Sequence, residues 1–210
     1  MVHPAADGRL WRYSGPDDPT MTAPRIPPAR LEAISRDADE IWRRHRDRRD
    51  GAFHGFVPSD VFAAHEALAE LRDAGAGSFV ELGAGAGTIT IVASWMGFEA
   101  LGVEIEPWLV EAAESLADRH DSSARFVAGS FLPSGFRIDD LVDPDFHVTY
   151  DDADCAFEAT GDELDEFDVI YAFPWPGEEA LFDALVDEYA RPGASFVTYH
   201  ADEGARVRTV

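Results

Sequence analysis

The residues with the clearest chemical potential form a glycine-rich segment that follows a short apolar run. The run is Phe79 to Leu82, and glycines then occupy every second position at Gly83, Gly85 and Gly87. Because glycine has no Cβ, the backbone of such a loop can pass close to a ligand. The next stretch, 88–96, is apolar and of helical length, and N–H groups at a helix start favour polar or anionic ligand groups. The segment therefore predicts a strand, a ligand-binding loop and a helix.

A carboxylate stands at the end of the next predicted strand, Glu99 to Glu104. In nucleotide-binding α/β folds an acid at this place accepts hydrogen bonds from ribose hydroxyls. A predicted helix over 107–120 and a third strand over 124–128 follow, and Gly129 comes directly after that strand. The order of glycine loop, acid and glycine is more specific than the glycine triplet alone. It predicts a site for an adenosine-containing ligand.

The spacing of the glycines narrows the choice of ligand. A dinucleotide fingerprint would place its third glycine at the position of Thr88, and a phosphate-binding P-loop needs a lysine, which the chain lacks. With Glu81 shortly before it, the Gly-x-Gly-x-Gly form resembles the first motif of class I S-adenosylmethionine-dependent methyltransferases. The resemblance covers roughly residues 59–200 and is strongest from Phe79 to Phe131. A nicotinamide-dependent oxidoreductase is disfavoured by the spacing but stays an alternative.

The resemblance implies a site for S-adenosylmethionine. In it the glycine loop passes under the methionine part of the cofactor, Glu81 lies near the amino group, and Glu104 holds the ribose. Ser130 stands where the family often has an aspartate, so adenine recognition would rest on backbone groups, with Phe131 stacking on the ring. The implied cofactor-binding residues are Glu81, Gly83, Ala84, Gly85, Gly87, Glu104, Ile105, Gly129, Ser130 and Phe131.

The predicted fourth strand, Asp168 to Phe173, ends in a proline- and aromatic-rich lip of Phe173, Pro174 and Trp175. It resembles the Asn/Asp-Pro-Pro-aromatic motif of amino-methylating nucleic-acid enzymes, except that Phe173 replaces the amide or acid. Such a lip suits a flat or apolar substrate or a lysine stem; alternatively, Trp175 only packs the turn. The lip also weakly resembles that of seven-strand histone-lysine methyltransferases. The catalytic residue is not determined, and the candidate bases are Tyr199, His200 and Glu178.

The alternation of strands and helices predicts an α/β fold of the Rossmann-like kind, a mostly parallel twisted sheet with helices on both faces. Residues 1–28 are expected to be a flexible tail, 29–73 a helical lead-in and 74–210 the methyltransferase-like domain, in one globular unit. Too little chain follows the fifth strand for the usual terminal hairpin, so the sheet is expected to be curtailed there. Met21 is an alternative natural start.

The composition limits partners and location. The chain has 210 residues and a formal net charge of −24, which disfavours nucleic acid as a partner. Cys155 is the single cysteine, which fits a reducing cytoplasm, and no apolar run is long enough for a bilayer. The acidic run over 139–158 is interpreted as a solvated loop, so no metal is predicted. The basic cluster 43–49 is interpreted as a solvated helix end.

The sequence thus predicts a cytoplasmic S-adenosylmethionine-dependent methyltransferase that acts on a small molecule or a protein side chain. The alternative is a non-catalytic cofactor- or partner-binding module with the same fold. Oligomeric state is not predicted.

Overall fold

The computed structural model describes residues 24–48, 58–138, 141–142, 153–200 and 204–210. In these residues the strands form a six-stranded sheet with the order β3-β2-β1-β4-β5-β6. The strands are β1 (Ser78–Leu82), β2 (Glu99–Glu104), β3 (Arg125–Ala128), β4 (Val169–Ala172), β5 (Ser195–His200) and β6 (Gly204–Thr209). All neighbouring pairs are parallel except β5 and β6. The predicted Rossmann-like, mostly parallel sheet is therefore confirmed.

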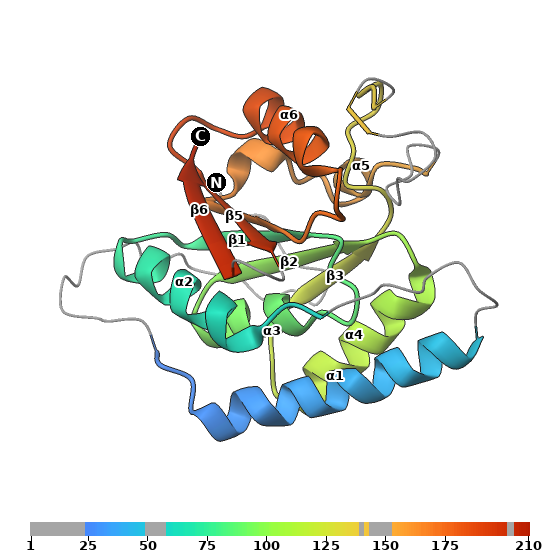
Figure 1. Ribbon diagram of the computed structural model, residues 1–210, viewed down its shortest axis with the longest axis vertical. Coiled ribbons are helices and arrows are strands. Elements are labelled where there is room, and N and C mark those ends of the chain that lie inside the picture. The colour runs from blue at the N-terminus through green and yellow to red at the C-terminus, as the bar shows by residue number, and fades with distance from the viewer. Residues whose placement is uncertain (1–23, 49–57, 139–140, 143–152, 201–203) are drawn as a thin grey trace.

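The helices form a layer on each side of this sheet (Figure 1). They are α1 (Pro28–Arg48), α2 (Val61–Asp73), α3 (Thr88–Trp95), α4 (Pro107–Arg119), α5 (Ala156–Thr160) and α6 (Glu179–Tyr189), with a single 3₁₀ turn at Leu164–Glu166. One buried cluster joins α1, α2, α3 and α4 to the sheet, and a second joins α5 and α6 to its opposite face. Strands buried on both faces are typical of parallel sheets.

Two helices lead into the sheet. In α1, Leu31, Ile34 and Ala38 are buried at helical spacing, as the apolar pattern predicts. At the start of α2, the carboxylate of Asp60 accepts hydrogen bonds from the backbone N–H groups of Phe62 and Ala63, at 2.8 and 3.3 Å. Such a cap satisfies amides that have no partner inside the helix. The domain boundaries drawn from the sequence stay a prediction.

The imidazole of His65 fastens the segment before α1 to α2. Its Nε2 accepts a hydrogen bond from the backbone N–H of Ile26 at 3.1 Å. Burial lowers the pKa of His65, which suits a ring that must stay neutral to accept this bond. His65 therefore has a structural role on the apolar face of α2.

The C-terminal half departs from a regular strand-helix repeat, as the sequence indicates. Between β3 and β4 the described residues contain only the short helix α5 and the 3₁₀ turn. Residues 143–152 of this segment lie outside the described residues. After β5 a single antiparallel strand, β6, ends the described sheet where the usual fold has two more strands, so the curtailed edge is confirmed.

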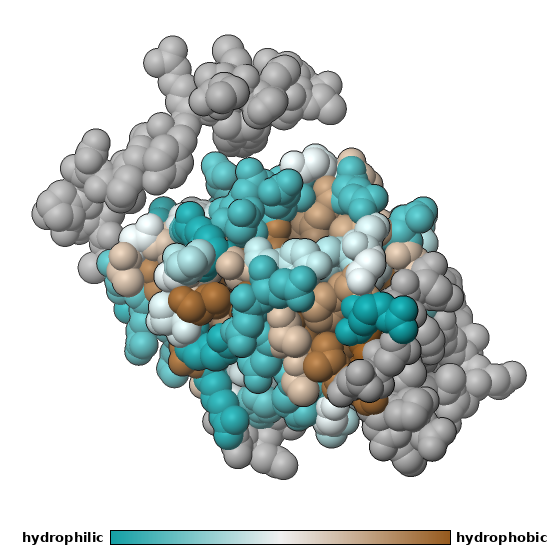
Figure 2. Space-filling view, turned by 90° about the horizontal axis from the view of Figure 1, so that it is seen from above, coloured by the Kyte–Doolittle hydropathy of each residue, from teal (hydrophilic) through white to brown (hydrophobic). Residues whose placement is uncertain are grey.

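The molecular surface reflects the charge of the chain. On the face shown in Figure 2, hydrophilic side chains predominate and apolar ones appear in smaller areas between them. Among the described residues, the large hydrophobic side chains that stay exposed are Phe62 and Val207. Most large hydrophobic side chains of the described residues are thus buried or packed in the two clusters.

Candidate functional site

The glycine loop lies at the point where the strand order reverses. From β1 the chain builds outward through β2 to β3, and then returns to the other side of β1 with β4. In open α/β sheets, ligands bind at this switch point, beyond the carboxyl ends of the strands. The loop that follows β1 and the lip that follows β4 both lie at this edge. The sheet therefore brings together the predicted cofactor loop and the predicted substrate lip.

The loop needs glycine for two different reasons. Gly87 precedes α3 with φ +76°, and a Cβ there would lie 2.5 Å from the ring of Phe126 and 2.8 Å from Ala113. Gly83 also has a positive φ but is exposed, and a Cβ on it would meet nothing within 4 Å. Gly87 is thus required by packing inside the protein, whereas Gly83 leaves an open surface that a ligand can approach.

The carboxylate of Glu104 is tied to the loop. Its Oε2 accepts a hydrogen bond from the backbone N–H of Gly85 at 2.7 Å, and its Oε1 accepts one from Glu106 at 3.0 Å. The side chain is only 8% exposed, and burial raises its pKa. Each carboxylate oxygen keeps acceptor capacity beyond these bonds. The predicted ribose-binding acid therefore lies at the loop, held in a fixed orientation.

Glu81 performs a structural task that the sequence did not reveal. Its Oε2 accepts hydrogen bonds from the backbone N–H and the hydroxyl of Thr90, at 2.9 and 2.5 Å. Because Gly87 has no side chain with which to cap α3, Glu81 supplies the acceptor for the first turn of that helix. Burial raises the pKa of Glu81 to about 8, and the nearby charge of Glu104 acts in the same direction.

The turn after β3 is held by backbone bonds. Gly129 donates to the carbonyl of Glu104 at 3.0 Å. Ser130 donates its N–H to Asp154 and accepts from the N–H of Ala156, while its hydroxyl accepts from Leu132. The N–H of Ser130 is therefore engaged within the protein, so any adenine contact at this residue needs another group.

Two apolar residues complete the predicted adenine side of the site. Ile105 follows Glu104 directly and is half-buried. The ring of Phe131 is also half-buried and packs against Phe182 of α6, with ring centroids 5.2 Å apart. Phe131 therefore connects the turn after β3 to the helix layer that α5 and α6 form. Stacking on adenine stays a prediction.

The lip at the end of β4 is ordered by aromatic contacts. Phe173 lies edge-on to Tyr199 of β5, with ring centroids 5.0 Å apart. Pro174 is buried and Trp175 is half-buried, and the carbonyl of Trp175 accepts a hydrogen bond from the N–H of Glu178 at 2.9 Å. Trp175 is thus both part of the turn and partly open to solvent, and the role of the lip in substrate binding stays a prediction.

The candidate bases differ in how open they are. Glu178 is 1% exposed at the start of α6, and Tyr199 is buried apart from 8% of its surface. His200 is half-buried, and its Nε2 lies 3.2 Å from the hydroxyl of Thr198. Among the three, His200 has the most open side chain, at the carboxyl end of β5. The identity of a catalytic base stays a prediction.

Two further aromatic residues lie close to the site, and the sequence did not single them out. Tyr171 is the direct neighbour of Glu81 across β1 and β4, and its side chain is fully buried. Burial raises the pKa of Tyr171 far above its usual range, and Ser59 and Tyr199 lie near its hydroxyl. The indole of Trp42 in α1 contacts Gly85. A tyrosine inside an apolar strand and a tryptophan ending an apolar stripe were the only sequence signals.

Two absences hold for the part of the chain that the structure describes. There, no three His, Cys, Asp or Glu side chains gather closely enough to hold a metal ion, although much of the acidic run 139–158 lies outside it. In the same residues, none of the helices combines the length and the apolar character needed to cross a bilayer.

Comparison with known proteins shows which fold this site belongs to. An O-methyltransferase from Bacillus cereus, solved with S-adenosylhomocysteine, superposes with a TM-score of 0.51 at 15% identity over 82% of this chain and 66% of that one. A candidate caffeoyl-CoA O-methyltransferase from Staphylococcus aureus gives 0.53 at 11% identity over 80% and 65%. The chain has the fold of class I S-adenosylmethionine-dependent methyltransferases. This methyltransferase fold confirms the resemblance drawn from the glycine spacing.

Sequence comparison reaches a shorter part of the chain. A stretch of 59 residues is 41% identical to the ribosomal protein L11 methyltransferase of Thermus thermophilus. The stretch makes up 27% of this methyltransferase-fold chain and 23% of that relative, so the chain matches about a quarter of the relative's length. No protein-family model matches the chain.

Proposed function

We propose that the protein is a methyltransferase that uses S-adenosylmethionine. The observation that carries the proposal is the hydrogen bond between Gly85 and Glu104. It joins a buried carboxylate to the glycine loop at the switch point of the sheet. In this proposal the ribose hydroxyls donate to Glu104 and the methionine part lies on the open surface at Gly83. Solved proteins of the same fold contain S-adenosylhomocysteine, which supports the choice of cofactor.

Methyl transfer from a sulfonium is an in-line displacement, and orientation and desolvation can supply most of the acceleration. This chain's residues would hold the cofactor on one side of the switch point and present the acceptor at Phe173 and Trp175 on the other. A hydroxyl or ammonium acceptor would also need a group that removes its proton. His200 is the most open candidate for that role.

The acceptor we propose is a small molecule or a protein side chain. The net charge of −24 opposes contact with a nucleic-acid backbone, which needs basic surface. The aromatic lip suits an apolar or flat group, and the short match to a ribosomal protein L11 methyltransferase keeps a protein acceptor in view.

Calorimetric titration with S-adenosylmethionine and S-adenosylhomocysteine tests the cofactor. We expect Glu104→Ala to weaken binding by about 1–3 kcal/mol, the size of a lost charge-assisted hydrogen bond. Glu99→Ala is the matched control, because Glu99 is an exposed acid at the opposite end of the same strand. Absence of binding by the wild-type protein, at both low and molar salt, would refute the proposal.

A non-catalytic module that only holds the cofactor or a partner is the second candidate, favoured by the curtailed sheet edge beyond β6. The two candidates differ in turnover. An enzyme incubated with S-adenosylmethionine and extract of its source cells would accumulate S-adenosylhomocysteine, whereas a binding module would not.

A further inference from the structure

The indole of Trp42 is pressed against the glycine loop from the outside. A Cβ on Gly85 would lie 2.8 Å from Cζ2 and 3.0 Å from Cη2 of Trp42, so the six-membered ring covers the Cα of this glycine. Gly85 is the residue whose N–H binds Glu104 at 2.7 Å. The indole therefore lies next to the hydrogen bond between Gly85 and Glu104, on which the proposed cofactor site depends.

The position of this ring is fixed by α1, which packs on α2, α3 and α4. Leu31, Ile34 and Ala38 bury one stripe of α1 in the core, and Trp42 continues that stripe by one more turn. Unlike those three residues, Trp42 is only partly buried. The stripe thus passes from core packing to a partly buried ring that lies against the loop.

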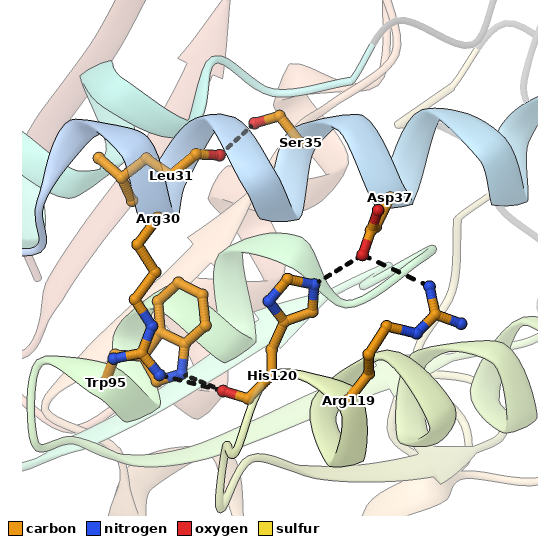
Figure 3. A network of polar contacts seen from close by, with 7 residues as sticks. All are labelled: Arg30, Leu31, Ser35, Asp37, Trp95, Arg119 and His120. Carbon is orange, nitrogen blue, oxygen red and sulfur yellow. Dashed lines mark hydrogen bonds and ion pairs between the residues drawn. The ribbon is translucent and has the colours of Figure 1, made fainter.

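Polar contacts hold the first half of α1 (Figure 3). The guanidinium of Arg30 stacks on the ring of Trp95 at 3.8 Å and donates to the carbonyl of His120 at 3.0 Å. Asp37 lies 3.0 Å from Nε2 of His120 and 3.4 Å from Nη1 of Arg119. Because Trp95 ends α3 and Arg119 ends α4, these contacts fix α1 at the ends of both helices that are remote from the glycine loop.

Gly83 and Gly85 therefore differ in what lies next to them. A side-chain carbon on Gly83 would have nothing within 4 Å, whereas on Gly85 the aromatic ring takes that space. Gly85 stands between Gly83 and Glu104 in the proposed cofactor site, and the ring of Trp42 lies against it. An aromatic wall there adds apolar contact at little cost in side-chain freedom.

We propose that Trp42 is a cofactor-site residue whose indole forms the outer wall of the site at Gly85. The proposal rests on the proposed use of S-adenosylmethionine. The N-terminal helix is then part of the binding site, and its docking on α3 and α4 positions the wall. Trp42 contributes to cofactor affinity and takes no part in methyl transfer itself.

The test compares Trp42→Leu with the wild-type protein by calorimetry with S-adenosylhomocysteine. We expect about a tenfold increase in Kd, the effect of losing one well-packed aromatic contact. Phe98→Leu is the matched control, because Phe98 is a buried aromatic residue just before β2, at the opposite end of that strand from Glu104, and its ring contacts Phe79 and Arg72. Its Kd should stay within about twofold of the wild-type value. All titrations are made well below the unfolding temperature of each variant.

A second measurement distinguishes direct contact between Trp42 and the ligand from a role of Trp42 in supporting the fold. Binding of S-adenosylhomocysteine should change the tryptophan fluorescence of the wild-type protein, and Trp42→Phe should lose that change while still binding. If Trp42→Leu binds as tightly as the wild type, or if Phe98→Leu loses as much affinity as Trp42→Leu, the wall is refuted. If the wild-type protein does not bind at all, the proposed function fails instead.

Discussion

The buried carboxyl group of Glu81 predicts an unusual dependence of stability on pH. Burial raises its pKa from 4.5 to about 8 in the folded protein. Between these two values the folded state holds a proton that the unfolded state has released. Stability rises with pH only where the unfolded state binds more protons, so the contribution of Glu81 must fall as pH rises from 4.5 to 8.

The size of this fall follows from the shift. With a pKa of about 8 in the folded state and 4.5 in the unfolded state, Glu81 costs about 1 kcal/mol of stability at about pH 5.5 and about 4 kcal/mol at about pH 8. Glu81→Gln removes the titration, and its amide oxygen can still accept from Thr90. We therefore expect the stability of the variant, relative to the wild type, to increase by about 3 kcal/mol over this range.

Urea unfolding of both proteins at the two pH values and at constant salt measures the difference. Titrations of groups remote from Glu81 occur in both proteins and cancel in the comparison, whereas that of Glu104, whose charge acts on Glu81, is part of the measured difference. Thr90→Val provides a control of opposite sign, because the Thr90 hydroxyl bond favours the charged form of Glu81. Its loss should steepen the pH dependence. Parallel pH curves for the wild type and Glu81→Gln would show that Glu81 is ionised in the folded protein and would refute the reasoning.

Three further predictions concern the fold around the site. Gly87→Ala should lower the free energy of unfolding by more than about 1 kcal/mol in urea titrations, because a Cβ clashes with Phe126 at a positive φ. Asp60→Ala should cost about 1 kcal/mol through loss of the α2 cap, while Asp60→Asn should retain most of it. The hydrogen bond from His120 lowers the pKa of Asp37, so its contribution is present above the unfolded pKa and is lost as pH falls through the folded value. Because this pair is partly exposed, Asp37→Asn should cost less than about 1 kcal/mol near neutral pH, measured by thermal unfolding against wild type.

The elements that the sequence predicted are those whose signals are local. The alternation of glycines fixes a loop after β1, and an acid at the end of β2 follows from the same strand pattern, so Glu104 and Gly85 were placed correctly at one edge. The curtailed sheet edge after β5 followed from the length of chain that remains there. Each of these inferences needs only neighbouring residues and the rule that parallel strands end together.

The contacts that the sequence did not reveal join residues whose spatial relation depends on tertiary packing. Glu81 meets Thr90 because α3 turns back over β1, and Trp42 meets Gly85 because α1 packs on α2, α3 and α4. An apolar stripe predicts a buried face but not which residue at its end leaves the core. Likewise, the backbone of Ser130 is engaged by residues 154 and 156, beyond a long acidic segment that carries no pairing signal.

Glu81 also offers a direct test of where the cofactor's amino group lies. At pH 7 a carboxyl group with a pKa of about 8 is protonated in about nine molecules of ten. An ammonium group brought close to it would favour the charged form, so binding would release up to about 0.9 proton per site near pH 7. Affinity should then increase as pH rises from 6 to 8.

Calorimetry of S-adenosylhomocysteine binding in two buffers of different ionisation enthalpy measures this release. Ribose hydroxyls that donate to Glu104 would also favour its charged form and add a second contribution. The difference between the wild type and Glu81→Gln reports the proton of Glu81 together with the change in Glu104, whose charge acts on Glu81. Equal release by the two proteins, with binding intact, would place the amino group away from Glu81 and leave capping of α3 as the role of that carboxyl.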